Sequence, residues 1–229
     1  AFALPFREEE MVVFSPRTGM EVLENYAGMA RSARHALFMT FAFGMNEEFR
    51  KVYQTARTPL RYALMEKACM AGKDREKFER EKKEIEAIRR KKENVFAIGN
   101  MIRTNRFDGW LRERLTGLNS NVKYIHNKFM LIDPLGKNPI VVTGSANFSV
   151  ASTKNNDENM VIVRGNQRVA DIYLGEYMRL FSHYSFRESL QWRDPLEKPK
   201  YLRTDDWWKD YFRDNARGAR RKYFAQVSE

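Results

Sequence analysis

A histidine and a lysine two residues apart, His126 and Lys128, stand out in a chain that has three histidines. They open an apolar run, and the pattern predicts a strand from His126 to Ile132. Alternate residues of a strand face the same side, so we expect the imidazole and the ammonium to lie together. A neutral imidazole nitrogen can attack phosphorus, and a neighbouring cation stabilises the charge that develops on the phosphoryl oxygens. The spacing therefore predicts phosphoryl-transfer chemistry, and the alternative is a half-buried strand without a reaction.

A Gly-Ser-Ala-Asn turn follows shortly after this strand. The apolar run Asn138–Thr143 predicts a second strand, paired with the first as a hairpin, which brings Gly144, Ser145 and Asn147 to the same edge. Glycine permits the tight bend, and Ser145 with its neighbouring backbone N–H groups can cap a short helix and hold an anion. We expect Ser145 and Asn147 to bind a substrate phosphate together with Lys128.

Three acidic residues near these strands receive different predictions. An imidazole needs an acceptor for its second nitrogen, and Glu158, which opens the predicted strand Glu158–Val163, is the candidate. Asp157 is adjacent but would face away, and it ranks lower. Asp133 has the opposite strand parity to His126, so we expect a structural role at the strand end. The chain has no cysteine cluster and no HExxH pattern, so a metal site is poorly supported.

The elements that must position these residues follow from the hydrophobic pattern. Apolar runs alternate with amphipathic segments along the first hundred residues, which predicts a β-α-β-α-β arrangement. We therefore expect an α/β fold with a mostly parallel or mixed central sheet flanked by helices. The predicted strands are Met11–Pro16, His35–Gly44, Leu60–Lys67 and Val95–Asn100, and the predicted helices are Met20–Ala33, residues 47–56 capped by Asn46, Phe107–Leu115 and a long core helix over Gln167–Phe186.

Two segments lie outside this core pattern. Residues 73–93 carry ten basic and seven acidic side chains at helical spacing, which predicts a solvated helical insert and, less strongly, a nucleic-acid contact. Residues 194–229 form a predicted C-terminal extension that mixes aromatic residues with arginines. We favour packing of this extension on a catalytic domain of residues 1–193, and base stacking is the alternative.

Composition narrows the class of protein. The 229 residues carry a net charge of +11, which favours anionic partners. The single cysteine, Cys69, excludes an internal disulfide, and the longest apolar run, Ala36–Phe43, is too short to span a membrane. The chain begins with Ala rather than Met, so we expect either a processed form or a piece of a longer protein.

The pattern His126-x-Lys128-x4-Asp133, followed by Gly144-Ser145-x-Asn147, resembles the HKD motif of the phospholipase D superfamily. The later stretch TKNNDENMVIV resembles the nuclease branch, where a glutamate at the place of Glu158 supports the histidine. The resemblance covers residues 12–186 without the charged insert. It implies a phospholipase D-like fold and a metal-independent phosphodiesterase that needs no cofactor and forms a phosphohistidine at His126, with Lys128 and Glu158 also catalytic.

Family members use two such motifs in one site, and this chain has one. His35 and His183 lack the following lysine. We therefore expect either a homodimer with the site on its two-fold axis or one half of a bilobed enzyme, and the chain resembles the C-terminal half of bacterial two-motif members. Nucleic acid is the favoured substrate because of the charge and the tail. A phospholipid headgroup is the alternative, and a catalytically idle binding module ranks last.

Overall fold

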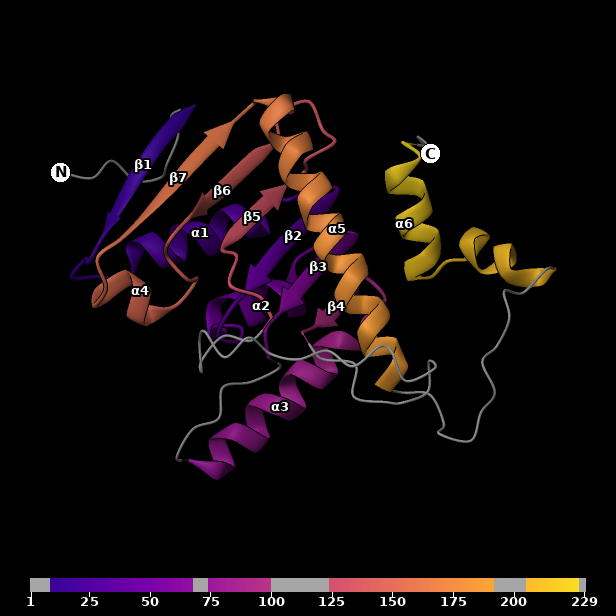
Figure 1. The fold of residues 1–229 in the computed structure, drawn as a ribbon, viewed down its shortest axis with the longest axis horizontal. Coiled ribbons are helices and arrows are strands. Elements are labelled where there is room, and N and C mark those ends of the chain that lie inside the picture. Colours follow the sequence, from indigo (N-terminus) through magenta and orange to yellow (C-terminus); the bar gives the residue numbers. More distant parts are fainter. Residues whose placement is uncertain (1–8, 68–73, 100–123, 192–204, 227–229) are drawn as a thin grey trace, which may run out of the picture.

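The structure, a computed structural model, describes residues 9–67, 74–99, 124–191 and 205–226. In this part of the chain, seven strands form one sheet in the order β1-β7-β6-β5-β2-β3-β4 (Figure 1). The elements are β1 Glu10–Ser15, α1 Glu21–Arg31, β2 Ala36–Phe41, α2 Glu47–Thr55, β3 Leu60–Met65, α3 Arg75–Arg89, β4 Asn94–Ile98, β5 Phe129–Ile132, β6 Ile140–Gly144, α4 Val150–Lys154, β7 Glu158–Arg164, α5 Gln167–Gln191, η1 Asp206–Phe212 and α6 Ala216–Phe224.

The sheet is mixed. Its parallel pairings join β2, β3 and β4, where each crossover contains a helix. The pairings of β5 with β2, of β6 with β5 and β7, and of β1 with β7 are antiparallel. The loop between β5 and β6 is too short for a parallel crossover, so this half of the sheet reverses direction. As a result, the start of β5, the end of β6 and the start of β7 lie at one end of the sheet.

Helices cover the two faces of the sheet, α1 and α2 on one side and α5 on the other (Figure 1). The strand β2 is buried along its whole length and serves both layers. Its alternate residues Leu37 and Met39 join the cluster that includes α1 and α2, whereas Phe38 joins the cluster that includes α5. This two-sided burial explains why its sequence is a continuous apolar run rather than an alternating one.

Most of the predicted elements are present. The strands are shorter than predicted, and the long core helix predicted over Gln167–Phe186 extends, as α5, to Gln191. Asn46 caps α2, because its side-chain oxygen accepts a 2.9 Å hydrogen bond from the backbone N–H of Glu48. One predicted strand is wrong in its extent: β5 begins at Phe129, not at His126. The backbone of residues 124, 125 and 127 bonds to the side chains of Glu66 and Thr40, as described below.

The described tail divides its aromatic residues between two environments. On α6, the rings of Tyr223 and Phe224 lie 6.0 and 6.4 Å from the ring of Phe38. On η1, by contrast, Trp207 and Trp208 are about half exposed. The helix predicted over residues 107–115, Cys69 and the domain boundary at 193–194 fall outside the described residues, and the division into two domains stays a prediction. No helix of the described ranges is long and apolar enough to cross a membrane.

Candidate active site

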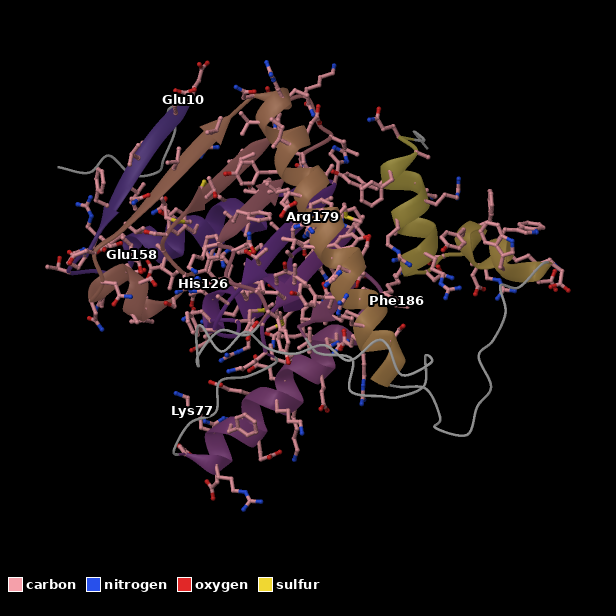
Figure 2. The ribbon with its side chains drawn as sticks, in the orientation of Figure 1. Glu10, Lys77, His126, Glu158, Arg179 and Phe186 are labelled. Carbon is pink, nitrogen blue, oxygen red and sulfur yellow. The ribbon has the colours of Figure 1, made fainter. Side chains whose placement is uncertain are left out.

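His126 lies in an irregular segment just before β5 and is exposed. Figure 2 shows it at the same end of the sheet as Glu158, the first residue of β7. Partial removal of the ring from water lowers the pKa of His126, and the nearby charge of Lys128 lowers it further. The carboxylates of Glu66 and Glu158 act in the opposite direction without cancelling the shift. The imidazole is therefore held in its neutral, nucleophilic form at neutral pH.

The side chain of Lys128 is brought close to His126 even though neither residue belongs to a regular strand. Lys128 is buried, and its Nζ donates a 2.5 Å hydrogen bond to the carbonyl oxygen of His126. Burial lowers the pKa of Lys128, and the charge of Glu158 opposes this effect. A cation with so little solvation interacts strongly with an anion that enters the site.

Glu158 is half-buried, and its Oε1 accepts a 3.2 Å hydrogen bond from the side chain of Asn156. Its charge raises the pKa of both His126 and Lys128, and its role as the acceptor for the imidazole stays a prediction. The neighbouring Asp157 is exposed and precedes the strand.

The turn after β6 has two distinct parts. A Cβ at Gly144 would collide with the backbone carbonyl oxygen of Asn159, so only glycine fits there. The hydroxyl of Ser145 accepts a 2.9 Å hydrogen bond from the backbone N–H of Asn159, and the backbone N–H of Ser145 donates to the Asn159 carbonyl oxygen over 2.9 Å. Ser145 thereby ties the turn to β7, and its contact with a phosphate stays a prediction.

Asn147 has an amide group that is not fully satisfied within the protein. Its backbone N–H donates to the hydroxyl of Ser152 over 3.1 Å, which fixes it at the start of α4. Its Oδ1 is buried and has no hydrogen-bond partner in the described part of the chain. A buried polar atom without a partner costs about 1–3 kcal/mol, and such atoms are typical of sites that bind a ligand.

Asp133 lies at the far end of β5 from His126. Its carboxylate accepts hydrogen bonds from three successive backbone N–H groups, those of Arg34, His35 and Ala36, over 2.7 to 2.9 Å. Asp133 adopts a φ of 47°, and the bonds fix the start of β2 against the end of β5. This arrangement also holds His35 at the end of the sheet opposite to His126.

The third histidine, His183, is engaged elsewhere. It lies on α5, where its Nδ1 is 2.9 Å from the guanidinium of Arg187. Neither His35 nor His183 is among the groups whose charge acts on His126.

Two residues that the sequence reasoning missed hold the segment around His126. Glu66, directly after β3, accepts hydrogen bonds through Oε2 from the backbone N–H groups of Tyr124 and Ile125, over 3.0 and 2.7 Å. Thr40 on β2 donates to the carbonyl oxygen of Asn127 over 2.7 Å and accepts from the N–H of Phe129 over 3.0 Å. The available signal was a polar side chain within, or directly after, a strand that is otherwise buried. A polar group buried there needs a hydrogen-bond partner.

The loop after β2 contributes an aromatic wall. The ring of Phe43 meets that of His126 edge to face, with 5.9 Å between centroids and an interplanar angle of 86°.

Among the described residues, no group of three or more His, Cys, Asp or Glu side chains is arranged to hold a metal ion.

The family of the chain follows from a comparison with family models. Residues 66–181, about half of the sequence, match the model described as "Cardiolipin synthase, PLD-like domain". The chain therefore belongs to the phospholipase D-like family. The curated proteins compared with the chain include no significant match.

Several solved structures resemble the chain in fold. NucT from Helicobacter pylori has 15% identity and a TM-score of 0.52, and the match covers 76% of this chain and 95% of NucT. Nuc from Salmonella typhimurium, a phospholipase D family member, has 15% identity and a TM-score of 0.48 over 76% of this chain and 93% of Nuc. Polyphosphate kinase from Porphyromonas gingivalis has 14% identity and a TM-score of 0.46, covering 83% of this chain and 27% of the kinase. At such identities the likeness concerns the fold.

Proposed function

We propose that the protein is a phosphodiesterase that cleaves nucleic acid through a phosphohistidine at His126. One ring nitrogen of His126 forms a bond to phosphorus while the bond from phosphorus to the leaving oxygen breaks. The leaving oxygen takes a proton from a second imidazole, and water then cleaves the bond between nitrogen and phosphorus. The observation that carries the proposal is the exposed His126, whose backbone carbonyl oxygen accepts a hydrogen bond from the buried Lys128 side chain and whose pKa the Lys128 charge lowers, at the end of the sheet where Glu158 begins β7.

The remaining polar groups of the site fit this chemistry. The Lys128 ammonium provides a preorganised positive charge for the phosphoryl oxygens, and the side-chain N–H groups of Asn147 can donate to them. Glu158 acts as the acceptor that orients the second ring nitrogen of His126. These groups supply charge stabilisation without a metal, so we expect activity in the presence of EDTA.

The second imidazole must come from outside the described residues, and another copy of the chain is one source. His35 is held at the opposite end of the sheet and His183 is engaged with Arg187, so neither supplies the proton. A two-fold axis beside His126 would place two identical imidazoles in one site. A second motif-bearing half of a longer protein is the other source of this group. Light scattering after size exclusion separates the two, because a dimer of this chain should be active and a strict monomer inactive.

Nucleic acid is the substrate that the charge favours. The net charge of +11 attracts polyanions, and the exposed Trp207 and Trp208 on η1 offer faces on which bases can stack. A phospholipid headgroup is the second candidate, because the matching family model takes its description from cardiolipin synthase.

The experiment compares plasmid DNA, RNA and phosphatidylcholine vesicles, each with EDTA, for the wild-type chain and for His126→Asn. We expect EDTA-resistant cleavage of nucleic acid that weakens as salt increases and that disappears in His126→Asn. Release of headgroups from the vesicles, while the nucleic acid stays intact, would reject nucleic acid as the substrate and support phospholipid. Cleavage that survives in His126→Asn would reject His126 as the nucleophile and the phosphodiesterase mechanism with it.

A further inference from the structure

Glu66 is buried to a degree that its place at a strand end does not explain. It directly follows β3, and its backbone N–H donates a 2.9 Å hydrogen bond to the carbonyl oxygen of Phe41, so the pairing with β2 continues to this point. The residue is 1% exposed. A carboxylate taken out of water is strongly destabilising unless hydrogen bonds compensate for the lost hydration. Its partners therefore indicate what the burial achieves.

The side chain of Glu66 bonds to the two residues directly before His126. Its Oε2 accepts from the N–H of Tyr124 and from the N–H of Ile125, over 3.0 and 2.7 Å. Hydrogen bonds to a charged acceptor are roughly twice as strong as neutral ones. Their effect is to fix the backbone that leads into His126 against the end of β3.

The other side of the same segment is held by Thr40, which is also 1% exposed. Its hydroxyl donates to the carbonyl oxygen of Asn127 and accepts from the N–H of Phe129. His126 thus lies between two anchored points that come from adjacent parallel strands, β3 and β2. Residues 125–127 lie outside any strand, and these side chains accept from or donate to the backbone on both sides of His126.

We propose that Glu66 is a positioning residue for His126: its buried carboxylate holds residues 124–125 in place and so directs the imidazole toward the substrate phosphate beside Lys128. The inference rests on the proposed function of His126 as nucleophile. The charged groups that act on the imidazole are Lys128, Glu66 and Glu158. Glu66 acts on the protonation of His126 through its charge and on the location of His126 through its hydrogen bonds.

Two substitutions separate these effects. Glu66→Gln keeps an acceptor oxygen for the two N–H groups but removes the charge, whereas Glu66→Leu removes both. Glu188→Gln is the matched control. Glu188 is also buried and accepts a backbone N–H, that of Ile98, over 3.1 Å, but it is not among the groups whose charge acts on His126.

The first measurement follows the ring protons of His126 by NMR during a pH titration, with His126→Asn used for assignment. We expect Glu66→Gln to lower the pKa of His126 relative to the wild-type protein, and Glu188→Gln to leave it unchanged. Amide exchange at Tyr124 and Ile125 should stay slow in Glu66→Gln and become much faster in Glu66→Leu. An unchanged His126 titration in Glu66→Gln, or unchanged exchange in a folded Glu66→Leu, would overturn the proposal.

The second measurement is the rate of cleavage. A misplacement of about 1 Å costs about 100-fold in rate, so we expect a loss of this size in kcat for Glu66→Leu with little change in KM. If Glu66→Leu does not fold, Glu66→Asp, whose shorter side chain draws the carboxylate away from the two N–H groups, replaces it in the exchange and rate measurements, with the same outcomes expected. The NMR measurements need no substrate, so their failure rejects the role of Glu66, whereas activity retained in His126→Asn rejects the proposed reaction.

Discussion

The Nζ of Lys128 donates a hydrogen bond to the backbone carbonyl oxygen of His126, two residues earlier in the chain. The bond fixes the ammonium to the backbone of the residue that carries the imidazole. The charge of Lys128 also lowers the pKa of His126, so in the proposed reaction one residue would act both on the phosphate and on the protonation of the nucleophile.

Replacement of Lys128 by Met should separate these two contributions. We expect kcat to fall by about 100-fold or more, since one preorganised charge contributes this much to a charged transition state. The pKa of His126 should rise at the same time, because a positive neighbour is lost. Cleavage rates and an NMR titration measure the two effects. Lys128→Arg is the control that keeps the charge, and a His126 titration equal in both variants would contradict the electrostatic link.

The pH dependence of activity should reflect the lowered pKa of His126. The nucleophile must be neutral, so the rate should rise with pH through a midpoint below about 6.5, the ordinary value for histidine. Glu158→Gln should move this midpoint lower, because the carboxylate of Glu158 raises the pKa of His126. The profile of kcat/KM against pH measures the midpoint in the free protein. A midpoint above that of a histidine in a model peptide would contradict the electrostatic environment of the site.

Asp133 should matter for stability rather than for the protonation of the nucleophile. Asp133→Ala removes the acceptor of three backbone N–H groups, and we expect a loss of about 2–3 kcal/mol in the free energy of unfolding. Urea denaturation measures this loss, and the titration of His126 should stay unchanged. Asp157→Asn, at an exposed position, serves as the comparison and should cost less than about 0.5 kcal/mol. Equal losses of unfolding free energy in the two variants would contradict the structural role of Asp133.

Gly144→Ala should disturb the turn that carries Asn147. The added Cβ would meet the Asn159 carbonyl oxygen, so the end of β6 must move away from β7, with a cost of about 1–3 kcal/mol. Gly28→Ala, in α1, has open space around its Cβ and should instead stabilise the protein by about 0.5–1 kcal/mol. Thermal unfolding of both variants tests the pair. A Gly144→Ala protein as stable as Gly28→Ala would show that the turn adapts freely.

Local chemistry explains which features the sequence predicted. The cap at Asn46 and the strand at Ala36–Phe41 depend on residues that are neighbours in the chain, so their patterns were sufficient. The direction of pairing in the sheet and the late start of β5 depend on partners far away in sequence. Thr40 is 87 residues from Asn127, with which it bonds, and no spacing rule reveals such a contact. The catalytic roles predicted for His126, Lys128, Glu158, Ser145 and Asn147 await the experiments above.

The register of the edge strand has a consequence for how the protein can be shortened. Ser15 pairs with Glu158 across β1 and β7. β1 therefore covers the edge of β7 at the residue where that strand begins. A chain trimmed to begin at Pro16 would retain every motif residue. It would, however, leave β7, which begins at Glu158, as an exposed edge strand that can pair with strands of other molecules.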